Sequence, residues 1–169
     1  MVSASASIEI ARSPARVRQV LTDFAHSHEW SQGPVKAVQP LAPGGRLDVG
    51  DKLKVTFGGG ISVTAEITEN SPTEFMWQGG LPGLVNGEHS FRFEESKITP
   101  SSTTFVNSEV FTGILSKLSE GSKNSSSPGF EKFNESLKQE SRVLKSSSVV
   151  RPSVHHFVLR VGDVVMWRI

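Results

Sequence analysis

The stretch NGEHSFRFEE, residues 86–95, alternates between apolar and polar side chains. Successive residues of a strand point to opposite faces, so His89, Phe91 and Phe93 share one face and the polar residues between them share the other. The pattern predicts a half-buried strand over 88–95. A histidine then lies on the apolar face of that strand.

A second alternating stretch, residues 102–112, follows after a turn-forming segment near 98–99. Because the connection is short and rich in turn residues, we expect a hairpin. Antiparallel pairing through that turn sets three pairs opposite each other: Phe93 and Phe105, Phe91 and Asn107, and His89 and Glu109. The hairpin therefore predicts that His89 and Glu109 are cross-strand neighbours.

Upstream of this hairpin, β-prone runs alternate with turn formers such as APGG, GGG and NSPTE. Short connections of this kind join antiparallel strands, whereas parallel strands need longer crossovers. The N-terminal residues also alternate, with apolar side chains on one phase from Ala4 to Ile10. We therefore expect a strand at the N-terminus and further strands at 35–40, 46–57, 61–70, 74–79, 88–95 and 102–112.

Two helices are predicted from their start signal, a serine N-cap followed by proline at the first helical position. Ser13-Pro14 starts a helix over 14–25, and a short helical turn follows before Gly33-Pro34. Ser127-Pro128 starts a helix over 128–145, which is roughly 27 Å long and can cross a whole sheet.

Together these elements predict an α+β protein of the helix-grip type. A curved antiparallel seven-stranded sheet wraps around the long C-terminal helix, with one or two short helices after strand 1. One helix does not fill a sheet curled this far, so we expect a cleft of about 300 to 1,000 Å³ between sheet and helix.

The order of elements resembles the START-like, or SRPBCC, superfamily, and the motifs resemble its polyketide cyclase/dehydrase-like branch. The resemblance rests on four stretches: SPARVRQVLTDFAHSHEW, NGEHSFRFEE, TTFVNSEVFTGIL and GFEKFNESLKQ. It implies binding of a hydrophobic or amphipathic small molecule, lipid or polyketide-like, in the cleft. Some members of the branch also catalyse cyclisation or dehydration there, and the fold alone does not choose between these activities.

The resemblance covers residues 1–145, which we expect to form the START-like helix-grip domain. Residues 146–169 have no counterpart in it and follow the helix that closes the predicted core. We expect this C-terminal tail to be loosely packed or disordered, so that its deletion leaves the melting temperature nearly unchanged.

His89 and Glu109 are the candidate catalytic residues. As a proton-transferring pair, Glu109 would orient the imidazole and raise the pKa of His89 toward neutral pH. The alternative is a structural pair in which two polar groups satisfy each other. The ligand-binding candidates share a place on the sheet, hairpin or helix faces that border the expected cleft: Trp30, Trp77, Leu84, Phe91, Phe93, Asn107, Phe111, Phe130, Phe133 and Leu137.

Several of these candidates have a second interpretation. Trp30 and Trp77 suit core packing equally well, because aromatic residues dominate protein cores. The apolar stripe of the long helix can serve as core and as the roof of the cleft. The loop GGLPGLVNG, which contains Leu84, is either an apolar gate at the cleft mouth or an ordinary long hairpin.

The composition restricts the partners. Eighteen basic and 17 acidic residues leave a net charge of +1, too little to attract nucleic acid. No transmembrane segment is expected, and the absence of cysteine fits a cytoplasmic protein. No cofactor and no metal are expected, since the histidines lack ligand spacing. A protein-interaction domain, like chaperone co-factors of this fold, is a third possible function.

Overall fold

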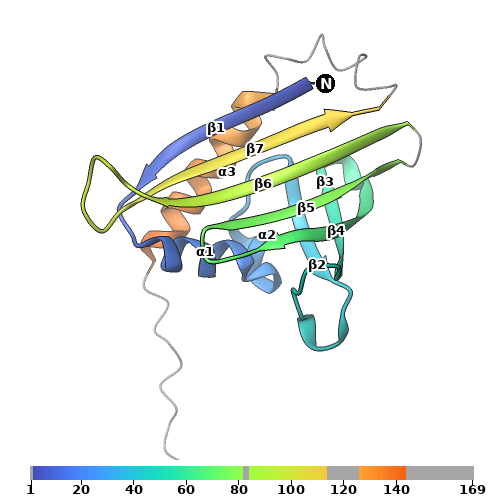
Figure 1. The fold of residues 1–169 in the computed structure, drawn as a ribbon, viewed down its shortest axis with the longest axis horizontal. Helices are drawn as coiled ribbons and strands as arrows, with labels where there is room; N and C mark the ends of the chain where they lie inside the picture. Colours follow the sequence, from blue (N-terminus) through green and yellow to red (C-terminus); the bar gives the residue numbers. More distant parts are fainter. Residues whose placement is uncertain (1, 82–83, 114–125, 144–169) are drawn as a thin grey trace, which may run out of the picture.

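The structure, a computed structural model, describes residues 2–81, 84–113 and 126–143 (Figure 1). The predicted tail, 146–169, lies outside the described residues. The elements follow in this order: β1 (Val2–Ile10), α1 (Pro14–Thr22), η1 (Phe24–His26), α2 (Ser27–Trp30), β2 (Val35–Pro40), η2 (Pro43–Gly45), β3 (Lys52–Phe57), η3 (Gly58–Gly60), β4 (Ser62–Asn70), β5 (Glu74–Leu81), β6 (Val85–Glu95), β7 (Thr103–Thr112) and α3 (Ser126–Arg142).

All seven strands form one antiparallel sheet in the order β1-β7-β6-β5-β4-β3-β2. β1 and β2, which are joined by the short helices, therefore lie at opposite edges. Figure 1 shows the sheet curling, with α3 on its concave side and α1 and α2 across its lower end. The predicted helix-grip arrangement is confirmed.

The predicted boundaries differ from the structure mainly before β3. We expected a strand from residue 46, but β3 begins at Lys52. The intervening segment is held as a loop, in which the Arg46 guanidinium contacts the Asp48 and Asp51 carboxylates at 3.0 Å each. These local ion pairs stabilise a turn where alternation alone indicated a strand. α3 begins at Ser126, two residues earlier than predicted.

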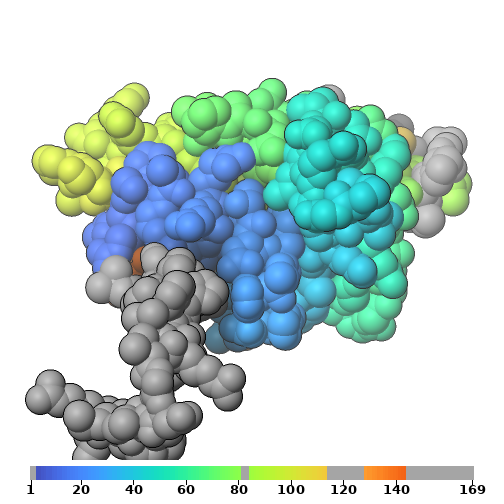
Figure 2. Space-filling model, turned by 90° about the horizontal axis from the view of Figure 1, so that it is seen from below, coloured from blue at the N-terminus to red at the C-terminus, as the bar shows by residue number. Residues whose placement is uncertain are grey.

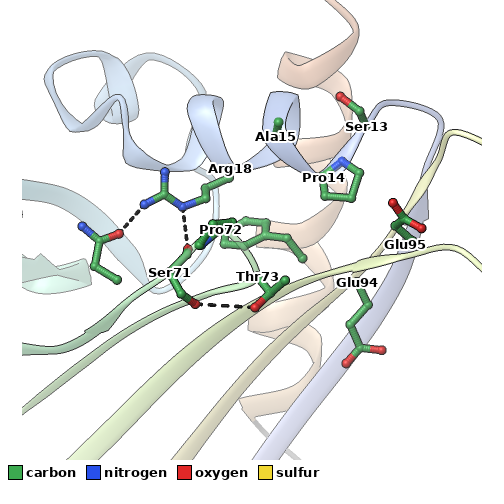
Figure 3. Close-up of a pocket in the computed structure, with 11 residues that line it drawn as sticks. Ser13, Pro14, Ala15, Arg18, Ser71, Pro72, Thr73, Glu94 and Glu95 are labelled. Carbon is green, nitrogen blue, oxygen red and sulfur yellow. Dashed lines mark hydrogen bonds between the residues drawn. The ribbon is translucent and has the colours of Figure 1, made fainter.

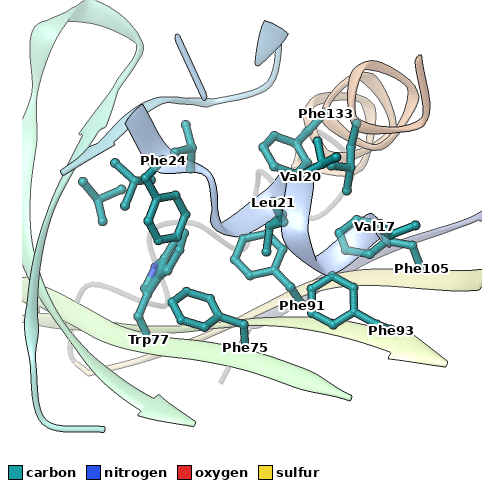
Figure 4. Close-up of a cluster of buried hydrophobic side chains, with 14 of the residues drawn as sticks. Val17, Val20, Leu21, Phe24, Phe75, Trp77, Phe91, Phe93, Phe105 and Phe133 are labelled. Atoms are coloured by element: carbon teal, nitrogen blue, oxygen red, sulfur yellow. The ribbon is translucent and has the colours of Figure 1, made fainter. Parts of the chain in front are cut away.

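α1 forms for the predicted reason. The Ser13 hydroxyl accepts a hydrogen bond from the Arg16 backbone N–H, and Pro14 occupies the first turn. The helix buries Val17 and Leu21 against the sheet, where aromatic side chains from β5, β6 and β7 meet it (Figure 4). Burial of this face, rather than helix propensity, provides most of its stability.

The middle of α3 packs closely on the segment after α2. Phe133 and Leu137 of α3 are buried, and the Phe133 ring lies 5.5 Å from the Trp30 ring. At Gly33 a Cβ atom would lie only 2.6 Å from Cβ of Phe133. Glycine at this position therefore allows the close approach of α3.

Seen from below, residues of α1, η1 and α2 lie across the middle of the molecule, between the β6–β7 turn and the β2–β3 segment (Figure 2). This layer closes the lower end of the grip. In the described part of the chain, none of the helices is long and apolar enough to cross a membrane.

Candidate functional site

The central hairpin has the predicted register. β6 and β7 place His89 opposite Glu109, Phe91 opposite Asn107 and Phe93 opposite Phe105. Side chains of directly opposed residues lie on the same face of a sheet. His89 and Glu109 are therefore cross-strand neighbours on the concave face.

His89 is 2% exposed and lies among aromatic rings. Its imidazole stacks on Phe91, with ring centroids 4.4 Å apart and an interplanar angle of 18°. Trp77 lies 5.3 Å away on β5, and Phe130 of α3 lies 5.4 Å away. A polar ring in such a place needs hydrogen-bonding partners.

One partner comes from a chain of buried amides. Nε2 of His89 lies 2.7 Å from Oδ1 of Asn107. Nδ2 of Asn107 donates to Oδ1 of Asn134 at 3.2 Å, and Nδ2 of Asn134 donates to the Ala6 carbonyl at 3.2 Å. This chain connects the hairpin, α3 and β1.

Asn134 is absent from the sequence-predicted site, although it is 1% exposed. Residues three or four apart share a helix face, and Asn134 lies four residues after Phe130 and three before Leu137. An amide within the buried stripe of an amphipathic helix is the signal that could have found it.

The other imidazole nitrogen is not hydrogen-bonded. Nδ1 of His89 lies 3.8 Å from Oε2 of Glu109, a separation that exceeds hydrogen-bond length. It has no hydrogen-bonding partner among the residues that the structure describes. Burial lowers the pKa of His89 to about 4, against a smaller opposing effect of the Asn107 hydrogen bond. The predicted rise in the pKa of His89 is therefore wrong, because the loss of solvation outweighs the Asn107 hydrogen bond, which acts in the opposite direction.

Glu109 reaches the solvent slightly, with 14% of its side chain exposed. Burial raises its pKa to about 7, because an apolar setting disfavours the charged carboxylate. Gly87 makes room for the carboxyl group, since a Cβ there would lie 3.0 Å from Oε1 of Glu109. Near neutral pH the pair thus combines an uncharged imidazole with a carboxyl group close to its midpoint.

The structure brings together only some of the predicted ligand-binding residues. Those that surround the His89–Glu109 pair are Trp77, Phe91, Asn107 and Phe130, with half-buried Phe111 beside Gly87. Those that pack farther from it are Phe133 and Leu137 of α3, Trp30 of α2, which contacts Phe133, and Phe93, which contacts Phe105. Leu84 is 46% exposed, and the backbone of Leu81 pairs with that of Val85.

The described residues also border hollows of very different size. Beneath α2, a cavity of about 20 Å³ lies among Trp30, Trp77, Phe91 and Phe133, which is room for about one water molecule. A groove of about 810 Å³ lies instead beside the start of α1 (Figure 3), and not between the sheet and α3, where a cleft of this size was predicted. The groove is lined by Arg18, the β4–β5 turn and the end of β6, with the Arg18 guanidinium donating to the Ser71 carbonyl at 2.9 Å.

A curled antiparallel sheet that wraps around a C-terminal helix defines a helix-grip protein, and this one has a buried polar pair on the concave face of its sheet. The chain belongs to the family described as polyketide cyclase/dehydrase and lipid transport, whose sequence model matches residues 1–142. The resemblance found in the sequence motifs is thereby confirmed.

Several solved structures share this fold at low sequence identity. A hypothetical protein from Helicobacter pylori is 18% identical with a TM-score of 0.66, over 83% of this chain and 87% of that one. A protein from Thermus thermophilus is 14% identical with a TM-score of 0.63, over 82% and 96%. Norcoclaurine synthase from Thalictrum flavum is 12% identical with a TM-score of 0.60, over 82% and 84%. No curated protein sequence matches the chain.

Proposed function

We propose that the protein binds a hydrophobic or amphipathic small molecule, lipid or polyketide-like, on the concave face of the sheet. The observation that carries this proposal is the His89–Glu109 pair, a titratable polar group within a wall of aromatic side chains. Ligand sites are mostly apolar with a few placed polar groups. The family description, which includes lipid transport, supports the same function.

The exposure of side chains along the hairpin indicates where the ligand enters. On the concave face of β7, Phe105 and Asn107 are buried, whereas Glu109 and Phe111 are partly exposed. β6 changes in the same direction, from buried His89 to partly exposed Val85. We infer that the polar end of the ligand meets Glu109 and that its apolar body lies against Phe111 and Phe130.

Two matched probes test this function. By isothermal titration calorimetry, 2-naphthol, which carries a hydroxyl group, should bind more tightly than 2-methoxynaphthalene, which carries none to donate. Glu109→Leu, which removes the acceptor, should reduce this preference about tenfold, the equivalent of one net hydrogen bond. Glu88→Leu, on the opposite and exposed face of β6, should leave the preference unchanged.

Native mass spectrometry of the protein purified from its own host supplies the physiological ligand. An apolar molecule with one or two polar groups is the expected finding. Failure of both naphthalene probes to bind, together with no copurifying molecule under gentle conditions, would contradict the binding function.

A second candidate function is acid–base catalysis of a cyclisation or dehydration. The observation that favours it is the raised pKa of Glu109, about 7, beside an uncharged imidazole, because proton transfer is efficient when a pKa lies near the working pH. Copurifying molecules that differ by one water, in a ratio that Glu109→Gln changes, would support dehydration. A single molecule, unaltered by the substitution, would support binding alone.

A further inference from the structure

We propose that Asn134 is a positioning residue, which acts through Asn107 to hold His89 in the tautomer that carries its hydrogen on Nε2, so that bare Nδ1 faces the Glu109 carboxyl group. In this arrangement Glu109, and not His89, is the group that meets the ligand. The tautomer follows from the hydrogen bonds alone, whereas the contact of Glu109 with a ligand rests on the proposed function.

The donor-to-acceptor direction of the hydrogen bonds through Asn107 and Asn134 is determined by the last acceptor, the Ala6 carbonyl. A backbone carbonyl can only accept a hydrogen bond, so the Ala6 oxygen requires the Nδ2 group of Asn134 to face it. Oδ1 of Asn134 must then face Asn107 and accept from its Nδ2 group. The orientation of both amides is thereby fixed by a β1 carbonyl that is 128 residues away in the sequence.

The same chain determines the histidine tautomer. With Nδ2 of Asn107 used for Asn134, its Oδ1 faces Nε2 of His89 at 2.7 Å. Without a hydrogen on Nε2, two lone pairs would meet at this distance in a buried site, which is strongly unfavourable. Nε2 therefore carries the hydrogen of the neutral ring, and Nδ1 keeps its lone pair.

Bare Nδ1 is the unsatisfied atom of the site, buried and directed toward Glu109. A protonated Glu109 carboxyl group could donate to it after closing the 3.8 Å separation to hydrogen-bond length, about 2.8 Å. All donors would then point one way, from Glu109 through His89, Asn107 and Asn134 to Ala6. His89 has no free polar atom left for a ligand, so it orients Glu109.

NMR of the full-length ligand-free protein tests this inference. Long-range ¹H–¹⁵N correlations distinguish the two tautomers of an imidazole, and a His89→Gln variant identifies the His89 signals. The wild type at neutral pH should show hydrogen on Nε2. Leucine is close to asparagine in shape and provides no acceptor. In Asn134→Leu the Asn107 amide can therefore rotate by about 180°, and the spectrum should no longer show hydrogen on Nε2 alone.

The control is Ser136→Ala, which removes another buried polar side chain of α3 that bonds to the Phe133 carbonyl and not to the His89 chain. It should leave the tautomer unchanged, although it alters the same helix. Asn107→Leu, which removes the acceptor itself, should act like Asn134→Leu and replaces it if that variant does not fold.

Two results would overturn the inference: hydrogen on Nδ1 in the wild type, or an unchanged Nε2–H signature when Asn134 or Asn107 is replaced by leucine. Because the tautomer is read without ligand, its failure is distinct from failure of the proposed function, which the naphthalene titrations measure. If His89 carries its hydrogen on Nε2 but neither probe binds, the positioning role of Asn134 stands and the proposed contact of Glu109 with a ligand does not.

Discussion

Replacing Glu109 by glutamine should stabilise the protein at alkaline pH and have little effect at acidic pH. The pKa of Glu109 is raised from 4.5 to about 7 in the folded protein. The unfolded chain therefore ionises first as the pH rises, while the folded protein still holds its proton. Wild-type stability is lost progressively from 4.5 to about 7. The Glu109→Gln variant has no charge to bury at this position, so it keeps its stability over this pH range.

The size of the effect follows from the pKa difference. At about 1.4 kcal/mol for each pH unit, a rise from 4.5 to about 7 corresponds to a little over 3 kcal/mol. Since 14% of the side chain still contacts solvent, we expect the advantage of Glu109→Gln to grow by about 2 to 3 kcal/mol between about pH 5 and about pH 8. Other titrating groups are common to both proteins and cancel in the difference.

Urea unfolding followed by tryptophan fluorescence measures this difference, because Trp77 is buried beside the pair. Unfolding free energies of wild type and variant would be compared at several pH values across that interval. Glu88→Gln, an exposed residue on the other face of β6, is the matched control and should show no pH-dependent gain. A Glu109→Gln difference that stays flat, or that shrinks as the pH rises, would refute the argument from burial.

Three further predictions concern neighbouring features. His89→Phe should gain stability relative to the wild type as the pH falls from 6.5 to about 4, because the unfolded histidine binds a proton in this range and the buried ring does not. Urea unfolding at acidic pH measures the difference, and the absence of a relative gain would contradict the prediction. Gly33→Ala should lower the unfolding free energy by about 1 to 3 kcal/mol, because the new Cβ would overlap Phe133, whereas Gly58→Ala, with Lys36 the nearest group at 4.0 Å, should cost less. Gly87→Ala should displace the Glu109 carboxyl group and weaken 2-naphthol binding in calorimetry, and an unchanged affinity would count against Glu109 as the ligand contact.

The fold could be predicted because its signals are local. Alternation located the strands, a serine followed by proline located the helix starts, and short turns required antiparallel neighbours. The pairing of His89 with Glu109 followed from the position of one turn. β3 was misplaced because the ion pairs of Arg46, which hold the preceding loop, do not appear as a change of hydrophobic period.

The site was harder to predict, because its chemistry depends on distance and burial. The sequence predicted that His89 lies beside Glu109. The 3.8 Å separation, and the loss of solvation that lowers the histidine pKa, depend on the three-dimensional packing of several elements. Asn134 contacts Asn107 and Ala6, residues from two other elements, and no periodicity specifies such a meeting. The groove beside α1 likewise joins segments that are distant in sequence.

The order of strands in the sheet also affects how the protein is made. β1 is synthesised before the other strands of this sheet, yet among the described residues it pairs only with β7, so that Val2 is opposite Phe111 and Ile10 is opposite Thr103. During vectorial synthesis at about 5 to 20 residues per second, the first strand waits several seconds for its partner. Its unpaired edge is open to other chains throughout that interval. β1 alternates serine with alanine and has few large apolar side chains. The unpaired strand therefore has a low tendency to aggregate until β7 has been synthesised.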